Sequence, residues 1–176
     1  MLNIVLYEPL IPQNTGNIIR TCVGVNAKLH LIEPLGFSLD EKHLKRSALD
    51  YYKYLNYQIY SDFAQFKKIN KGQYYFITRY GKKIYTEIKF KNTAEEIYLI
   101  FGKETTGVDR KLLSQEIDKT YRIPTNDKIR SLNLSNSVSI VVYEYLRQND
   151  FLDLEIYEPA TLKGKGYLDS FLSEEE

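Results

Sequence analysis

The feature that most constrains the fold is a regular alternation of strand-like and helix-like segments along the chain. Short apolar runs typical of buried strands occupy residues 2–8, 28–33, 57–60, 73–78, 97–102 and 120–124. Segments with a helical spacing of apolar residues lie between and after them, at 15–26, 38–52, 62–70, 108–117 and 132–148. Strands that alternate with helices predict an α/β domain built on a mostly parallel sheet flanked by helices.

Length and the distribution of apolar residues predict one soluble domain. A chain of 176 residues can bury one core, and we assign the domain to residues 1–150 and a C-terminal extension or tail to 151–176. The longest apolar runs are about five residues, whereas a membrane-spanning helix needs ~20. The opening sequence MLNIVLYEP predicts a strand rather than a signal peptide, because no basic residue precedes the apolar ones. We therefore expect a cytoplasmic protein without membrane association.

The cysteine, histidine and charge content argue against several kinds of site. A single cysteine, Cys22, and two distant histidines, His30 and His43, leave almost nothing to bind zinc, so we expect no metal. The formal net charge is only +1, so no overall basic field indicates a nucleic-acid partner. Basic residues nevertheless cluster locally, as they do between residues 42 and 46.

The aromatic composition is unusual, with sixteen tyrosines and no tryptophan. Half-exposed strand positions explain many tyrosines, because the ring fits a pleated and partly buried surface. Stacking platforms for nucleic-acid bases are the alternative. Composition alone does not favour this second interpretation.

Three of the predicted strands are followed by polar segments, at the sheet edge where parallel sheets hold ligands. The first segment, EPLIPQNTGNIIR, offers Asn14 or Thr15 as the cap of the following helix. Asn17 and Arg20 are three residues apart and share one helix face. One cap does not explain so many hydrogen-bonding groups. We therefore favour ligand contact over a capped helix with a solvated arginine.

The second segment, YLIFGKETTGVD, carries two glycines after a buried strand. Gly102 and Gly107 permit a left-handed backbone and would expose N–H groups to a ligand. The segment is not a P-loop, because no Gly-Lys-Ser/Thr sequence follows, and it lacks the dinucleotide fingerprint. It is typical of a loop that binds a small molecule, and a plain strand-to-helix turn is the alternative.

The third segment, RIPTNDKIRSLNLSNSVSIVVYEYLR, joins a polar helix start to an apolar helix. Its apolar residues recur at helical spacing and predict a core-facing stripe: Leu134, Val138, Val141, Val142 and Tyr145. Small polar residues crowd the helix start: Ser131, Asn133, Ser135, Asn136 and Ser137. Ordinary capping needs only one such residue, so the crowding indicates close backbone packing or ligand contact.

The segments YEPLIPQNTGNIIRTC, IFGKETTG and RIPTNDKIRSLNLSNSVSIVVYE resemble, in order and spacing, the three motifs of the SPOUT RNA methyltransferases. The resemblance covers about residues 1–150 and is strongest to the TrmL-like group, the tRNA (cytidine/uridine(34)-2′-O)-methyltransferases. It implies a deep trefoil knot in the C-terminal part of the domain, a homodimer, and S-adenosylmethionine as cofactor. The implied reaction methylates the ribose 2′-hydroxyl of the wobble nucleotide, so the partner is the anticodon stem-loop of tRNA.

The resemblance also assigns candidate site residues. The cofactor-binding positions are Thr78 (or Ile77 in an alternative alignment), Gly102, Ile123 and Ser131. The candidate catalytic residues are Arg20, Asn133 and Ser135. The candidate substrate-binding residues are Asn14, Asn17, Arg46, Asn136 and Tyr143. For each asparagine, pinning the knot is an equal alternative to substrate contact. The cofactor positions are expected to converge, with Arg20 beside them.

Arg20 matches the motif-one arginine that the family is proposed to use in activating the 2′-hydroxyl. Because a guanidinium stays protonated, we expect it to stabilise the developing oxyanion or an adjacent phosphate, while water or a phosphate oxygen accepts the proton. In-line placement of the two reactants supplies roughly 7–11 kcal/mol. The alternatives are methylation of another tRNA or ribosomal RNA nucleotide, and an RNA-binding protein of the same fold without activity.

Overall fold

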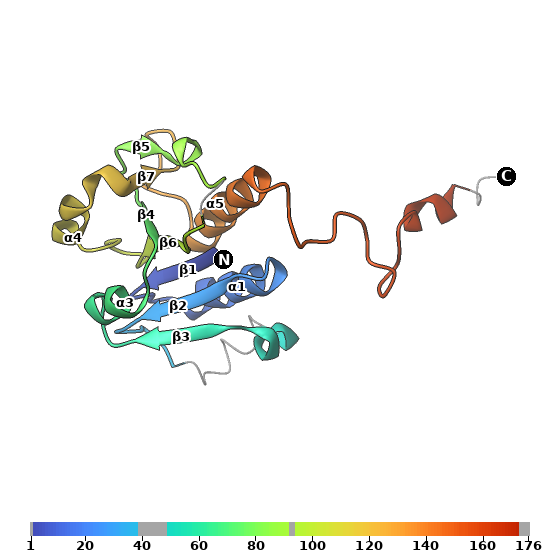
Figure 1. Cartoon of the computed structure of the whole chain (residues 1–176), viewed down its shortest axis with the longest axis horizontal. Coiled ribbons are helices and arrows are strands. Elements are labelled where there is room, and N and C mark those ends of the chain that lie inside the picture. Colours follow the sequence, from blue (N-terminus) through green and yellow to red (C-terminus); the bar gives the residue numbers. More distant parts are fainter. Residues whose placement is uncertain (1, 39–48, 92–93, 173–176) are drawn as a thin grey trace.

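The computed structural model describes residues 2–38, 49–91 and 94–172. Its central feature is a parallel sheet of seven strands (Figure 1). The strand order is β3-β2-β1-β6-β4-β7-β5, and all the recorded strand pairs are parallel. The strands are β1 (Leu2–Tyr7), β2 (Lys28–Ile32), β3 (Tyr57–Tyr60), β4 (Gln73–Ile77), β5 (Lys83–Ile84), β6 (Ile97–Gly102) and β7 (Thr120–Arg122). The predicted α/β class with a parallel sheet is confirmed.

Helices cover both faces of the sheet. One face carries α1 (Pro12–Gly24) and α5 (Leu134–Gln148), and the other carries α3 (Phe63–Ile69) and α4 (Arg110–Gln115) (Figure 1). Short 3₁₀ helices lie in the connections and near the C-terminus: η1 (Leu49–Tyr54), η2 (Tyr85–Glu87), η3 (Ile117–Lys119) and η4 (Tyr167–Phe171). The domain therefore has three layers, with the sheet in the middle.

The central strands β1 and β6 are buried on both faces. Ile4 and Leu6 pack into the α1/α5 layer, whereas Val5 between them packs into the α3/α4 layer. In β6, Leu99 and Ile100 divide in the same way, and all five side chains are at most 1% exposed. A strand covered on both sides needs apolar residues at every position. This explains why both strands are continuous hydrophobic runs in the sequence.

The predicted strands and helices agree with the structure except at specific places. Six of the seven strands fall inside the predicted apolar runs. The sequence did not predict β5, because it has only two residues, one of them Lys83, and such a short edge strand has no detectable period. The helix expected at 38–52 falls largely outside the described residues, and its described end forms η1.

The predicted cap of α1 is wrong. The helix begins at Pro12, so Asn14 and Thr15 lie inside its first turn and are buried there. The N-cap position is Ile11, whose side chain makes no capping hydrogen bond. Proline fits the first helical position because its fixed φ matches the helix and its missing N–H costs nothing there. The free N–H groups at this helix start must therefore find acceptors elsewhere.

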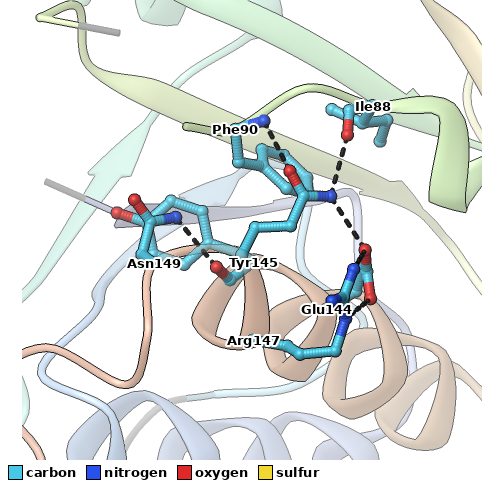
Figure 2. A network of polar contacts seen from close by, with 7 residues as sticks. Ile88, Phe90, Glu144, Tyr145, Arg147 and Asn149 are labelled. Atoms are coloured by element: carbon cyan, nitrogen blue, oxygen red, sulfur yellow. Dashed lines mark hydrogen bonds and ion pairs between the residues drawn. The ribbon is translucent and has the colours of Figure 1, made fainter. Parts of the chain in front are cut away.

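The C-terminal half of α5 is joined to the segment between β5 and β6, at Ile88 and Phe90 (Figure 2), by the side chain of Gln148. Its Oε1 accepts a hydrogen bond from the N–H of Phe90 at 3.0 Å. Its Nε2 donates to the carbonyl oxygen of Ile88 at 2.9 Å and to Glu144 Oε1 at 2.8 Å. Tyr145 contacts Phe90 edge-on with ring centroids 5.4 Å apart, which confirms its predicted packing role.

Beyond α5, the described residues 151–172 extend away from the sheet domain and include η4 (Figure 1). Phe151 and Leu154 still pack against the core. Farther along, large apolar side chains such as Ile156 and Leu168 are each 76% exposed. The three-layered core is thus built from residues that precede this extension.

A buried histidine on β2 connects the neighbouring strands β1 and β3 on the α3/α4 side of the sheet. His30 of β2 is 1% exposed, with Nε2 lying 2.9 Å from Asn3 Oδ1 and Nδ1 lying 2.8 Å from the Tyr60 hydroxyl. Burial lowers the pKa of His30 to about 3, and the nearby charge of Lys28 acts in the same direction. The imidazole is therefore neutral at physiological pH.

We predict that His30 makes the protein less stable in mild acid. Its pKa is about 3 in the folded chain and about 6.5 in the unfolded chain. Between these values the unfolded chain binds more protons, so the free energy of unfolding falls with falling pH, by up to ~1.4 kcal/mol per pH unit. His30→Gln should flatten this dependence in urea unfolding between roughly pH 4 and 6.5. An equally steep dependence in the variant would contradict the prediction.

Candidate functional site

Three of the predicted cofactor positions meet at the carboxyl ends of neighbouring strands. β6, β4 and β7 lie side by side, and the last residue of β4 is level with Phe101 and Tyr121. Gly102 ends β6, Thr78 follows β4, and Ile123 follows β7. Thr78 also donates its N–H to the carbonyl oxygen of Tyr121 at 2.8 Å. Because neighbouring strands lie about 4.8 Å apart, these positions occupy one edge of the sheet.

Gly102 lies where two backbone segments pass very close to each other. A Cβ at this position would lie 2.1 Å from the nitrogen of Val108 and 2.2 Å from the carbonyl carbon of Gly107. The following loop folds back on itself, since the N–H of Gly107 donates to the carbonyl oxygen of Lys103 at 2.9 Å. Gly107 has a φ of +76°, which confirms the predicted left-handed backbone there. Gly102 is required for the close approach instead.

Glu104 joins the second polar segment to the first. Its carboxylate accepts hydrogen bonds from the backbone N–H groups of Leu10 at 2.9 Å and Ile11 at 3.2 Å. It also accepts one from Asn14 Nδ2 at 2.9 Å. The N–H groups around a helix start lack partners within the helix. A carboxylate from a distant loop therefore binds the two N–H groups that lead into α1 and the Asn14 side chain in its first turn.

Asn14 and Asn133 extend this connection to the third polar segment. Asn133 Nδ2 donates to Asn14 Oδ1 at 2.9 Å. Asn133 Oδ1 accepts from the N–H of Ser135 at 2.9 Å, from its hydroxyl at 2.7 Å and from the N–H of Asn136 at 3.3 Å, so Asn133 caps α5. We call Glu104, Asn14 and Asn133 the polar link. It forms one hydrogen-bonded chain through all three segments.

Two buried side-chain polar atoms have no hydrogen-bond partner within the described part of the chain. They are Thr15 Oγ1 and Arg122 Nε. Thr15 directly follows Asn14, and Arg122 directly precedes Ile123. Buried polar groups are nearly always hydrogen-bonded. An unpartnered donor beside Ile123 therefore fits a ligand that presents acceptor atoms at this sheet edge.

Arg20 lies in a separate hollow between α1 and α5. The hollow has a volume of about 310 Å³ and is lined by Asn17, Arg20, Thr21, Gly24, Val25 and Tyr143. The guanidinium carbon lies 5.2 Å from the ring centroid of Tyr51. Asn17 and Arg20 both face this hollow, as their spacing predicted, and Tyr143 meets them from α5 with 54% of its surface exposed.

Within one chain the structure separates Arg20 from the strand-end positions. Arg20 is six residues beyond Asn14 on α1, which corresponds to ~9 Å along the helix axis. In the described part of the chain, no recorded contact joins Arg20 to Gly102, Ile123 or Ser131. The candidate residues therefore divide into two groups, one at the sheet edge and one in the α1/α5 hollow.

The remaining candidates differ in accessibility. Ser131 and Asn136 are exposed at the start of α5, whereas Ser135 is buried beneath the cap. Arg46 lies outside the described residues, so the structure does not place it. Ser131 and Asn136 are therefore accessible to a ligand, whereas the N–H and hydroxyl of Ser135 are both bonded to Asn133.

Sequence reasoning missed Glu104. Its three hydrogen-bond partners lie 90 to 94 residues earlier in the chain, so no local pattern identifies them. The available signal was one carboxylate between two glycines in a segment assigned to ligand binding. Sequence reasoning also missed the ion pair of Glu8 and Lys103, which lines a hollow of about 350 Å³ at the ends of β1 and β6.

Residues 1–143 match the SpoU rRNA Methylase family. The chain belongs to this family. A relative from Geobacillus stearothermophilus, provisionally named a tRNA (cytidine(34)-2′-O)-methyltransferase, is 48% identical over 151 residues, 85% of this chain and 96% of its own. The Escherichia coli (strain K12) tRNA (cytidine(34)-2′-O)-methyltransferase is 43% identical and covers 84% and 94% of the two chains.

A solved structure described as giving structural insights into the 2-OH methylation of C/U34 on tRNA matches this SpoU-family chain with a TM-score of 0.78. It is 36% identical, and the match covers 86% of this chain and 97% of the solved one. Within the described residues, no group of three or more His, Cys, Asp or Glu side chains could hold a metal ion. None of the described helices has both the length and the apolar character to cross a membrane.

We predict that Glu104→Ala uncouples the three polar segments. Three donors lose their acceptor, so the free energy of unfolding should fall by about 2–4 kcal/mol in urea titration. S-adenosylmethionine binding, measured by calorimetry, should weaken roughly tenfold, since the strand-end loop loses its support. Glu104→Gln keeps the size but turns an amide donor toward these donors, so it should also destabilise.

Glu116→Gln is the matched control for this prediction. Glu116 makes ion pairs with Lys67 and Lys119, whose side chains are about half exposed, and solvent-accessible pairs are worth about 1 kcal/mol or less. Equal effects of Glu104→Gln and Glu116→Gln, or no effect at Glu104, would show that the polar link does not support the site.

Proposed function

We infer that this protein methylates the ribose 2′-hydroxyl of nucleotide 34 of tRNA, a cytidine or modified uridine, with S-adenosylmethionine as methyl donor. Family membership and relatives at 43% and 48% identity, aligned over most of both chains, support the reaction and the substrate. The structural observation that carries the inference is the meeting of three polar segments at one sheet edge, joined by the polar link.

We propose that Thr78, Gly102, Ile123 and Ser131 hold the cofactor, and that the chain around them is tied in a deep trefoil knot. Three of these positions end or follow neighbouring strands. The unpartnered Arg122 Nε adds a donor beside Ile123. When bound, the cofactor supplies an electrophilic methyl group. The chain contributes a fixed pocket wall, because Gly102 lets the loop from Lys103 to Gly107 close against the strand end.

Arg20 is proposed to stabilise the negative charge that develops on the 2′-oxygen. A guanidinium cannot accept the proton at neutral pH, so the proton passes to water or to a phosphate oxygen. Its planar fork of N–H groups can hold an oxyanion and a neighbouring phosphate together. Tyr51 lies against the guanidinium at 5.2 Å and fixes its position. Asn17 shares the hollow and is placed to contact the ribose.

The polar link is proposed to position the site rather than to react. Both ends of the Asn133 amide are engaged within the protein, with Asn14 on one side and Ser135 on the other. Asn14 is likewise held between Asn133 and Glu104. Among the candidate polar residues near the start of α5, the exposed Asn136 and Ser131 are therefore assigned to ligand contact.

We propose that a homodimer completes each site. Arg20 lies in a hollow of its own, ~9 Å along α1 from Asn14. A second copy packed on the face formed by α1 and α5 would bring its Arg20 toward the sheet edge of the first. Asn17 and the exposed Tyr143 lie on this same face. Dimerisation would also place two modest basic surfaces side by side, which a chain of net charge +1 needs to bind RNA.

Nucleotide-resolution mapping of 2′-O-methyl groups tests the function directly. The purified protein, with S-adenosylmethionine and tRNA from cells lacking the gene, should add a methyl group at position 34. Methylation at another tRNA position, or only in ribosomal RNA as the family description suggests, would overturn the substrate. No methylation of either RNA would overturn the enzyme assignment.

The Arg20→Lys variant tests the role of the guanidinium, because it keeps the positive charge and removes the planar fork of N–H groups. Its turnover should fall about 100-fold or more, while cofactor binding stays at the parental level. Arg147→Lys is the control, since the Arg147 side chain is 65% exposed and pairs with Glu144 of the same helix. A parental rate in the Arg20→Lys enzyme would show that bidentate geometry does not matter.

Mixed dimers test whether two copies share a site. We predict that Arg20→Ala and Ser131→Trp proteins are each inactive, the second because its exposed position accepts a bulky ring that blocks the proposed cofactor pocket. Co-expressed, half the dimers should be mixed and carry one intact site, so activity should return to about a quarter of the parental level. No recovery in a mixture shown to contain mixed dimers would place the whole site in one chain.

A further inference from the structure

The guanidinium groups of two arginines lie against the exposed ring of Tyr80. The Arg79 guanidinium carbon lies 4.9 Å from the ring centroid, and that of Arg110 lies 5.7 Å from it. The two arginines come from different elements, since Arg79 follows β4 and Arg110 begins α4. Tyr80 is 53% exposed, and both arginines are exposed as well. The ring therefore gathers two cations on the molecular surface.

This cluster lies beside the proposed cofactor position. Arg79 and Tyr80 directly follow Thr78, and the turn is held by the N–H of Gly81, which donates to the Thr78 carbonyl oxygen at 3.0 Å. A Cβ on Gly81 would lie 2.2 Å from the carbonyl carbon of Tyr121, so the turn is pressed against β7. The position of Tyr80 is thus set by the same strand ends that form the candidate site.

Arg110 reaches the cluster from the first position of α4, directly after the second polar segment. It lines the hollow at the ends of β1 and β6 together with Thr106 and Gly107. This segment follows β6, the strand next to β4 in the sheet. Two arginines that follow adjacent strands therefore contact one tyrosine. Such a three-residue contact is more than two neighbouring surface residues would make.

The two guanidiniums are free to bind an anion. In the described part of the chain, no carboxylate forms a recorded ion pair with Arg79 or Arg110, whereas Lys82, Lys103 and Arg147 all have one. The adjacent Asp109 caps α4 by accepting from the N–H of Leu112 at 2.9 Å. A guanidinium lying over a ring keeps its N–H edges pointing outward, which suits phosphate oxygens.

We propose that Arg79, Tyr80 and Arg110 bind the phosphate backbone of the single-stranded anticodon loop next to the methylated nucleotide. This assignment rests on the proposed function and adds the location of an RNA contact. The arginines contact phosphates, and Tyr80 is a positioning residue that holds both guanidiniums in place. Phosphate contacts of this kind fix the register of an RNA without reading its sequence. They would present one nucleotide of the loop to the cofactor at the neighbouring strand ends.

The test is the binding of a fluorescently labelled anticodon stem-loop RNA to the full chain, measured by anisotropy over a series of salt concentrations. Arg79→Gln and Arg110→Gln should each weaken binding about three- to tenfold. Each should also lower the slope of log K against log salt by about 0.7–0.9, because one phosphate contact is lost. Tyr80→Leu should weaken binding less and leave the slope nearly unchanged, since both charges remain.

Lys165→Gln is the matched control, because Lys165 lies 4.1 Å from the Tyr157 ring centroid in the C-terminal extension, away from the site. It should bind RNA like the parental protein. Calorimetric titration with S-adenosylmethionine should give parental affinity for all these variants. Parental cofactor binding shows that the fold and the cofactor pocket are intact.

The outcomes separate the two proposals. If the parental protein binds and methylates RNA while the arginine variants keep its affinity and salt slope, the RNA contact is overturned and the function stands. If the arginine variants lose cofactor binding, the residues support the pocket and the RNA contact is again overturned. If the parental protein neither binds nor methylates RNA, the function itself is overturned, and the RNA contact with it.

Discussion

The carboxylate of Glu104 is the contact on which the arrangement of the three polar segments depends. It satisfies backbone N–H groups at the start of α1 and holds Asn14, which in turn holds Asn133 at the start of α5. A charged acceptor bonded to several donors is stronger than a neutral one. One side chain therefore sets the positions of two helix starts relative to the end of β6. Two of the proposed cofactor positions adjoin these elements, since Gly102 ends β6 and Ser131 precedes α5.

The parallel sheet explains why the candidate residues form two groups. All strand ends of a parallel sheet point to one edge, so Thr78, Gly102 and Ile123 meet there although they are far apart in sequence. Arg20 belongs to a helix that leaves this edge, and the helix carries it into the α1/α5 hollow. A single chain thus presents the proposed cofactor positions and the proposed electrostatic group on different surfaces, which is the physical reason for proposing a shared site.

The tyrosines show how composition can mislead. Tyr60, Tyr74 and Tyr98 are fully within the core, not half exposed, and pack with Phe66 in one aromatic cluster. Burial raises the pKa of Tyr98 to about 12, and the nearby Glu96 adds to the shift. Tyr80 is instead exposed to solvent, and two exposed guanidinium groups lie against its ring. Neither use follows from the number of tyrosines, because burial is decided by the layer that each strand faces.

The sequence by itself determined the α/β class, six of the seven strands, the core-facing stripe of α5 and the three polar segments, because hydrophobic period and turn chemistry are local. Resemblance of those segments to a known family added the candidate cofactor positions. Only the tertiary structure decided that Glu104 binds the residues leading into α1, that Asn14 contacts Asn133, and that Arg20 has its own hollow. These contacts join residues 90 to 119 positions apart, and they depend on which strand ends are neighbours, which no local pattern encodes.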